Sequence, residues 1–210
     1  RTGGWERVSV GLSGTGTAGL KSGTARVDYV TDGTGTSGLG TLGVGNETVS
    51  VSGKVYRLAV GSVPASVTLA AVREGGVFAP VALSVGNVAA ADGYSDDLGV
   101  SLAGVGDVSV SGSVSRLGAG QTNGATLGVG YGGSTAVAGS VSGSATVSYV
   151  SKGQVGTGLA DAVPVVGGTS VGVSGKVYRL ASVGVSGTTM NLGNVRAGGA
   201  FSGGNVTVTN

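Results

Sequence analysis

Three carboxylates close together in the sequence form the densest group of side chains that could do chemistry. They are Asp92, Asp96 and Asp97, within the segment ADGYSDDLG. Hard cations such as Ca²⁺ prefer several convergent carboxylate and carbonyl oxygens. The spacing matches neither a helix–loop–helix calcium loop nor the glycine-rich calcium turns of β-helical repeats. The three aspartates are therefore weak candidates for a metal site, and a solvated turn that holds Tyr94 inward is the simpler interpretation.

Three glycine-rich segments have the spacing of known catalytic or nucleotide-binding motifs. GLGTLG (Gly38–Gly43) and GVGYGG (Gly128–Gly133) fit G-x-G-x-x-G, and GTSVG (Gly168–Gly172) fits G-x-S-x-G. Each motif functions only at a turn that leads from a strand into a helix. No helical pattern follows any of the three, so we predict neither a nucleotide cofactor nor a hydrolase nucleophile.

Two residue types are missing altogether, because the chain contains no His and no Cys. Without His there is no imidazole base or ligand and no Ser-His-Asp arrangement. Without Cys there is no disulfide framework and no thiolate metal site. The 10 acidic residues are too dispersed to favour the paired carboxylates of a glycosidase. The sequence thus predicts a protein that is not an enzyme, with no catalytic residues and no cofactor.

Charge is sparse, with 12 Lys and Arg against 10 Asp and Glu and a net charge of +2. The cations form no stripe, so we do not expect a nucleic-acid partner. The uncharged run from Leu117 to Ser151 is dominated by Gly, Ser, Thr and Ala. It lacks the apolar density of a transmembrane segment, and none is predicted. The opening RTGGWER has no apolar signal core, so any targeting segment is expected outside this chain.

The elements that must position these residues have the pattern of strands. Val or Leu alternates with Ser, Thr or Gly in seven segments: Val8–Leu12, Val49–Val51, Val81–Val85, Val108–Val110, Leu127–Tyr131, Val171–Val173 and Val206–Val208. Such alternation is typical of half-buried antiparallel strands. The 46 Gly residues oppose helix formation, by about 1 kcal/mol each relative to Ala. We predict an all-β fold of antiparallel β-sandwiches with no significant helix.

Three blocks of sequence occur twice, in the same order and at nearly constant spacing. SGKVYRLA occurs at Ser52–Ala59 and at Ser174–Ala181, 122 residues later. TARVDYV (Thr24–Val30) matches ATVSYV (Ala145–Val150), and VREGGVF (Val72–Phe78) matches VRAGGAF (Val195–Phe201). The blocks predict an internal repeat of about 122 residues, which is the size of one domain.

The phase of this repeat predicts three segments. Residues 60–181 form one complete sandwich, residues 1–59 the C-terminal part of another, and residues 182–210 the opening strands of a further one. The two end segments together lack a counterpart of about Val88–Gly120. We expect both ends to carry unpaired backbone groups and a bare apolar stripe.

Four segments carry a resemblance to a known family: Asn191–Asn210 (NLGNVRAGGAFSGGNVTVTN), Val88–Leu102 (VAAADGYSDDLGVSL), Ser22–Gly40 (SGTARVDYVTDGTGTSGLG) and Val49–Ala59 (VSVSGKVYRLA). The sequence here resembles the repeats of bacterial choice-of-anchor D surface proteins, which are immunoglobulin-like and distantly similar to ASPM-SPD-2-Hydin domains. The resemblance implies tandem immunoglobulin-like sandwiches in a protein that is secreted or held at the bacterial cell surface. It supplies no active-site residues.

The apolar residues of the last segment are the candidate self-assembly strands. They are Val183, Val185, Met190, Leu192, Val195, Val206 and Val208. We predict that residues 182–210 pair with residues 1–59 of a neighbouring copy, as in donor-strand complementation. Such head-to-tail contacts build open filaments when the rotation does not close. The expected function is a structural building block of a bacterial extracellular filament or surface array.

Two alternatives remain open. In the first, the chain is a slice of a long adhesin-type stalk, in which flanking repeats of the same chain complete both ends. In the second, it is a carbohydrate-binding module that holds surface glycans on exposed aromatic rings, for which Trp5 and Tyr131 are the candidates. Isolated aromatic residues more often serve packing.

Overall fold

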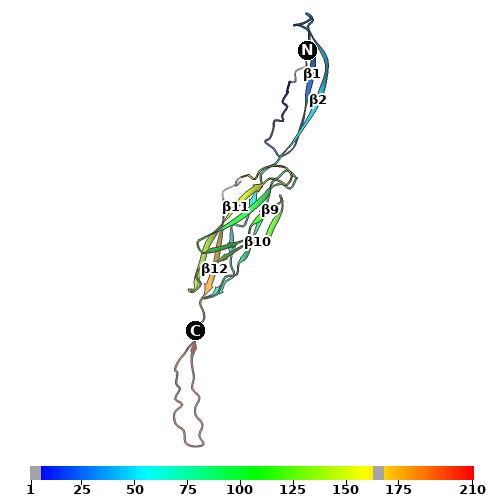
Figure 1. The fold of residues 1–210 in the computed structure, drawn as a ribbon. Helices are drawn as coiled ribbons and strands as arrows, with labels where there is room; N and C mark the ends of the chain where they lie inside the picture. Colours follow the sequence, from blue (N-terminus) through cyan, green and yellow to red (C-terminus); the bar gives the residue numbers. More distant parts are fainter. Residues whose placement is uncertain (1–5, 163–167) are drawn as a thin grey trace.

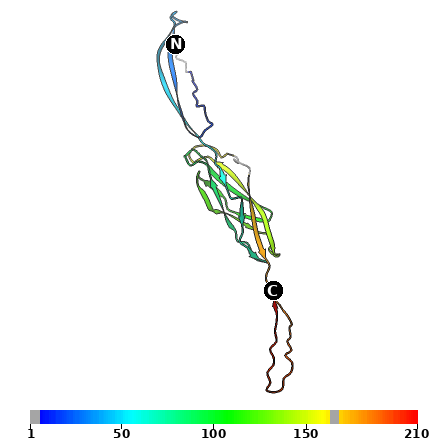
Figure 2. The ribbon, with the colours of Figure 1, turned by 180° about the vertical axis from the view of Figure 1, so that it is seen from behind.

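The computed structural model describes residues 6–162 and 168–210 (Figure 1). These residues contain strands and no helix, which confirms the predicted all-β class. None of them belongs to a helix long and apolar enough to cross a membrane. A β-sandwich lies in the middle of the molecule, and one arm extends from each of its two ends (Figures 1 and 2).

The first sheet of the sandwich has four strands in the order β3-β6-β10-β8. Their bounds are β3 (Gly61–Ser62), β6 (Val81–Asn87), β10 (Thr122–Tyr131) and β8 (Val108–Ser111). Every neighbouring pair is antiparallel. The alternating Val and Leu residues of β6 and β10 point to one face, as their period-two pattern predicts.

The second sheet is built around the long antiparallel pair β11 (Gly139–Lys152) and β12 (Thr169–Tyr178). On the β11 side it continues with β7 (Asp97–Val105) and β9 (Val114–Leu117). On the β12 side it ends with β4 (Ser66–Thr68) and β5 (Val72–Arg73), which both run parallel to β12.

The two parallel pairs depart from the predicted antiparallel arrangement. Strand β3 lies in the first sheet and β4 in the second, and only residues 63–65 join them. The chain therefore changes sheets without reversing direction, and it meets β12 running the same way. Pro64 suits this crossing because it has no backbone N–H to donate to a ladder.

The core of the sandwich is formed by the facing sides of the two sheets. Buried apolar side chains come from nearly all of its strands: Ala59, Val67, Leu69, Phe78, Leu83, Val85, Leu98, Val100, Val108, Val114, Leu117, Leu127, Val129, Ala145, Val147, Tyr149, Val171, Val173 and Val177. Fully burying a Val, Leu or Phe side chain contributes about 1.5–3 kcal/mol. Phe78 packs edge-on against Tyr131, with ring centroids 5.8 Å apart.

The N-arm, residues 6–55, contains a two-stranded antiparallel sheet of β1 (Gly19–Asp32) and β2 (Thr41–Val55). The C-arm, residues 182–210, contains only the short antiparallel pair β13 (Gly184–Val185) and β14 (Val208–Thr209). Both arms project away from the sandwich, in opposite directions along the long axis of the molecule (Figures 1 and 2).

Two expected strands in the arms are absent or shortened. Residues 8–12 form no strand, and of Val206–Val208 only Val208 belongs to one. In the sandwich, the strands with the same sequence pattern, β10 and β6, pair with each other. Residues 8–12 and 206–208 lie in different arms, at opposite ends of the molecule, so neither segment has its partner strand beside it. An alternating pattern alone does not supply the hydrogen bonds of a ladder.

Candidate functional site

The three aspartates predicted as weak metal candidates have separate partners. Asp92 accepts a hydrogen bond from Arg57 Nη1 at 2.8 Å, and Asp97 accepts one from Arg116 Nη1 at 3.0 Å. Asp96 accepts one from the Ser151 hydroxyl at 2.8 Å. Across residues 6–162 and 168–210, no group of three or more His, Cys, Asp or Glu side chains could hold a metal ion. The structure therefore does not bring these carboxylates together around one ion.

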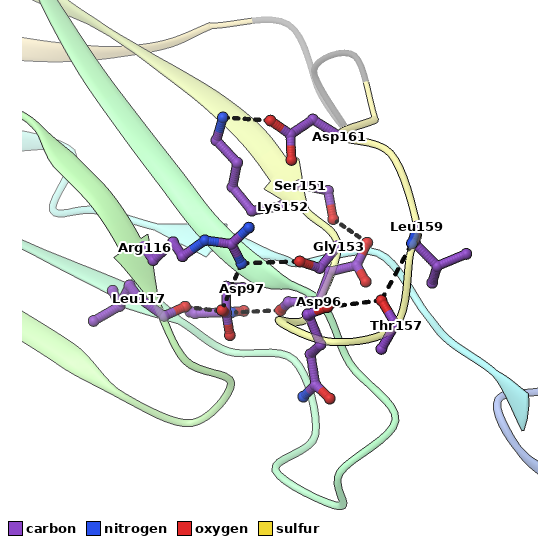
Figure 3. A network of polar contacts seen from close by, with 12 residues as sticks. Asp96, Asp97, Arg116, Leu117, Ser151, Lys152, Gly153, Thr157, Leu159 and Asp161 are labelled. Carbon is purple, nitrogen blue, oxygen red and sulfur yellow. Dashed lines mark hydrogen bonds and ion pairs between the residues drawn. The ribbon is translucent and has the colours of Figure 1, made fainter.

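Asp96 instead belongs to a buried polar network at the N-arm end of the sandwich (Figure 3). Ser151 donates to Asp96 and accepts from the backbone N–H of Ala59 at 2.8 Å. Asn87 Nδ2 donates to the carbonyls of Asp96 and Leu117 at 3.1 and 3.0 Å. Buried polar groups are mostly hydrogen-bonded in this way, although Asp96 Oδ1 has no hydrogen-bond partner among the described residues. The network fastens the chain that leaves the N-arm to three strands of the sandwich.

Arg57 forms a second attachment between the N-arm and the sandwich. Its N–H donates to the Tyr94 carbonyl, and the Asp96 N–H donates to the Arg57 carbonyl, both at 2.9 Å. Its Nη1 also donates to Ser95 Oγ at 3.0 Å. These bonds fix the chain just after the N-arm against the 92–96 turn, so this acidic segment attaches the arm to the sandwich.

We expect the Arg57–Asp92 contact to weaken in acid. The hydrogen bond that Arg57 donates lowers the pKa of Asp92 most, and the bond from the Tyr94 N–H lowers it further. A lowered carboxyl pKa means that the contact holds above the ordinary Asp range and is lost as the pH falls through the lowered value. An NMR titration of the Arg57 guanidinium resonance should show this acid transition. Asp92→Asn should remove it, and an Arg57 signal that titrates equally in both proteins would contradict the assignment.

The other sequence motifs lie on ordinary β structure. Gly38–Gly43 runs from the loop after β1 into β2, Gly128–Gly133 covers the end of β10, and Gly168–Gly172 opens β12. No helix follows any of them in the part of the chain that the structure describes. Tyr131 is packed on Phe78 and donates to Asp107 Oδ2 at 3.2 Å, so it is not a free stacking platform. Trp5 lies outside the described residues.

The N-arm hairpin has the same register as β11–β12, to which its sequence blocks match. Gly19 lies opposite Val55 in the arm, and Gly139 lies opposite Val177 in the sandwich. We call two residues counterparts when they match in this way, 120 residues apart for β1 and 122 for β2. The arm is therefore a copy of the β11–β12 hairpin that stands apart from a second sheet.

The inner face of this hairpin is buried in the sandwich and largely uncovered in the arm, where Leu12 lies over Gly23 and Gly53. In β11–β12 it consists of Ala145, Val147, Tyr149, Val171, Val173 and Val177, all buried. The counterparts in the N-arm, all exposed or half-buried, are Ala25, Val27, Tyr29, Val49, Val51 and Val55. Tyr149 is 3% exposed and Tyr29 is 45% exposed. The Tyr29 hydroxyl donates to Glu47 Oε2 at 3.2 Å, and the Glu47 charge raises the pKa of Tyr29.

Residues 183–210 of the C-arm match residues 60–87 of the sandwich, 123 residues earlier. The same turn occurs in both segments. The Gly76 N–H donates to the Arg73 carbonyl at 2.8 Å, and the Gly199 N–H donates to the Arg196 carbonyl at 2.8 Å. The glycine before each donor has a left-handed φ, 77° at Gly75 and 85° at Gly198. The turn is thus the same in the C-arm and in the sandwich, whereas the strand pairing differs, because Gly184 pairs with Thr209 and Gly61 pairs with Asn87.

Burial differs between these two segments. In the sandwich the apolar residues Val67, Leu69, Phe78, Leu83 and Val85 are all buried. The counterparts in the C-arm, all exposed, are Met190, Leu192, Phe201, Val206 and Val208. The predicted self-assembly residues Val183, Val185 and Val195 are exposed as well. The C-arm therefore keeps the apolar pattern of core strands without a core to cover it.

Phe201 is the residue of this surface that the sequence pattern missed. It is 57% exposed, whereas Phe78 is 3% exposed. A signal was present, because Phe201 ends the block VRAGGAF that matches VREGGVF. Alternation alone did not single it out, since Phe201 follows a turn and lies in no strand.

The comparisons with known proteins found no match in two cases. No family model matches the chain, and no curated protein matches it. The resemblance to choice-of-anchor D repeats therefore stays a prediction.

Proposed function

We propose that this protein is a non-enzymatic structural building block of a bacterial extracellular filament or surface array. Subunits join by strand complementation, in which the C-arm of one copy completes the N-arm of the next. The proposal includes tandem immunoglobulin-like sandwiches with a unit of about 122 residues, complete in residues 60–181 and partial in residues 1–59 and 182–210. The secreted or cell-surface location rests on the resemblance to choice-of-anchor D repeats.

One observation carries this proposal. The two arms match, in sequence, the two segments that pack against each other in the sandwich. In the sandwich, the segment from β3 to β6 packs against the β11–β12 hairpin. The N-arm has the sequence and register of that hairpin, and the C-arm has the sequence and turn of that segment. A second copy of this chain therefore offers, in its C-arm, the counterpart of the segment that covers this face in the sandwich.

The placement of the arms supports assembly between copies. They extend from opposite ends of the sandwich, so a chain does not reach its own N-arm with its own C-arm (Figures 1 and 2). Contacts between different surfaces of successive copies are heterologous, and they form open chains unless the rotation closes a ring. The C-arm contains a single charged residue, Arg196, so its docking requires little desolvation of charge.

A second candidate is completion by flanking repeats of one longer chain, as in an adhesin-type stalk. It is favoured by the strands that the arms lack, since neither arm has a counterpart of β7, β8 or β9. A full flanking repeat would supply them, whereas a second copy of residues 182–210 would leave a smaller module. Mass spectrometry of the native material separates the two candidates, because a stalk yields peptides of the same repeat beyond this sequence.

Sedimentation velocity over a range of concentrations, with negative-stain microscopy of the same samples, tests the proposed function. We expect the 210-residue chain to form concentration-dependent multimers that appear as linear chains of sandwiches. If the chain remains a compact monomer at every concentration, assembly between copies is wrong.

A further inference from the structure

We propose that the C-arm binds β2 of the next copy in one defined register, parallel to β2 and locked by two ring-on-glycine contacts. Met190 lies opposite Val51, and Val195 lies opposite Val55. Phe201 lies on Gly53, and Tyr29 lies on Gly184. This inference rests on the proposed function and specifies the partner surface.

The register follows from the parallel pairs of the sandwich. Val67 of β4 lies opposite Val173 of β12, and Val72 of β5 lies opposite Val177. The counterparts of these four residues are Met190, Val51, Val195 and Val55. In the N-arm, β2 pairs only with β1, so among the described residues its other edge has no strand beside it. That open edge offers backbone groups to an incoming strand.

Backbone hydrogen bonds of the sandwich predict those of the docked arm. The Leu69 N–H donates to the Ser174 carbonyl at 2.8 Å, and the Glu74 N–H donates to the Tyr178 carbonyl at 2.9 Å. The corresponding donors of the C-arm are Leu192 and Ala197. Their acceptors on β2 of the next copy and just after it are the carbonyls of Ser52 and Tyr56.

Two glycines of the sandwich are places where a ring approaches the backbone. A Cβ added at Gly175 would lie 2.7 Å from the ring of Phe78, and one added at Gly61 would lie 2.5 Å from the ring of Tyr149. Real Cβ atoms do not come this close, so each ring requires glycine beneath it. Glycine in a strand interior often marks such a close approach.

The arms retain both rings and both glycines, although the ring contacts are absent within one chain, where the neighbour of Gly184 is the Thr209 side chain. Gly53 and Gly184 are the counterparts of Gly175 and Gly61, and Phe201 and Tyr29 are the counterparts of the rings. Gly53 lies near the C-terminal end of β2 without a left-handed φ, so its backbone would accept other residues. A glycine there weakens an isolated strand. In one chain Leu12 lies beside it, 3.4 Å from where a Cβ would be, and the proposed ring of Phe201 would fill the remaining space over it.

These contacts also exclude other registers. A shift by one residue would turn the apolar side chains of the C-arm to the outer face. A shift by two residues would place the Phe201 ring on a side chain of β2 instead of on Gly53. Each arm supplies one ring and one glycine, so both contacts form only in the register of the sandwich.

Cysteine crosslinking of the full chain tests this register, because the chain has no native Cys. Ser52 and Asn191 are the counterparts of Ser174 and Thr68, which lie directly opposite each other with both side chains exposed. Neighbouring strands lie about 4.8 Å apart, within the Cα separation that a disulfide spans. Ser52→Cys with Asn191→Cys should give a ladder of covalent multimers under mild oxidation. The control pair Ser52→Cys with Thr189→Cys, on the same face and two residues out of register, should react at least about tenfold more slowly.

The glycine contact has its own test in the same assembly assay. Gly53→Val should weaken association at least about tenfold, whereas Gly43→Val, at an open position of β2, should leave it unchanged. The register is wrong, and the proposed function stands, if chains associate but the control pair crosslinks as fast as Ser52→Cys with Asn191→Cys. The same conclusion follows if Gly53→Val associates as well as the unchanged chain. If neither the variants nor the unchanged chain associate, the register and the proposed function are both wrong.

Discussion

A chain carrying Phe201→Asp should remain monomeric at concentrations at which the unchanged chain forms multimers. Phe78, its counterpart, is buried in the sandwich, and loss of a buried Phe side chain costs about 3–5 kcal/mol. A carboxylate at this place also loses its hydration without gaining a partner. Since about 1.4 kcal/mol is a tenfold change in affinity, the dissociation constant should rise more than about a hundredfold. Sedimentation velocity measures this rise directly.

Ala200→Asp is the matched control for this change. It places the same charge on the neighbouring residue, whose counterpart Val77 is 85% exposed in the sandwich. We expect Ala200→Asp to assemble like the unchanged chain. Equal loss of assembly in both variants would mean that charge on the C-arm, and not burial of the Phe201 ring, controls association.

The reciprocal change on the N-arm should have an equally large effect. Val51→Asp puts a carboxylate on the face of β2 whose counterpart, Val173, is buried in the core of the sandwich. Docking of the C-arm would bury this charge unpaired, which is costly enough to prevent it. We expect the dissociation constant to rise more than about a hundredfold, again by sedimentation velocity.

Ser52→Asp is the control on the same strand, since its counterpart Ser174 is exposed on the outer face. It should assemble normally. Neither substitution touches the sandwich, so its thermal unfolding should stay within about 2 °C of the unchanged protein. A lower unfolding temperature for Val51→Asp alone would show that the N-arm stabilises its own sandwich and is not a free docking face.

The sandwich strands could be predicted because alternation is a local property of the sequence. Residues 81–85, 127–131 and 171–173 alternate, and each alternating segment lies within a strand of the structure. The arms show the limit of this reasoning. Val8–Leu12 alternates as well, yet it forms no strand because the ladder needs a partner that lies elsewhere.

Contacts between residues far apart in the sequence could not be predicted, for the same reason. Nothing in the spacing of Asp92 indicates a partner 35 residues away, but the Arg57 guanidinium donates a hydrogen bond to this carboxylate. The parallel strands β4 and β5 have three residues and two residues, too few to show a period. Their pairing with β12 depends on how the chain changes sheets, and this three-dimensional feature sets the register proposed for the C-arm.

The central claim, that the C-arm of one copy completes the N-arm of another, is tested most directly by mixing the two damaged chains. Phe201→Asp keeps an intact N-arm, and Val51→Asp keeps an intact C-arm. Each alone should be monomeric, and an equimolar mixture should give a one-to-one dimer in sedimentation velocity, because one intact interface forms and none remains for growth. A mixture that contains only monomers, while the unchanged chain assembles, would contradict the account.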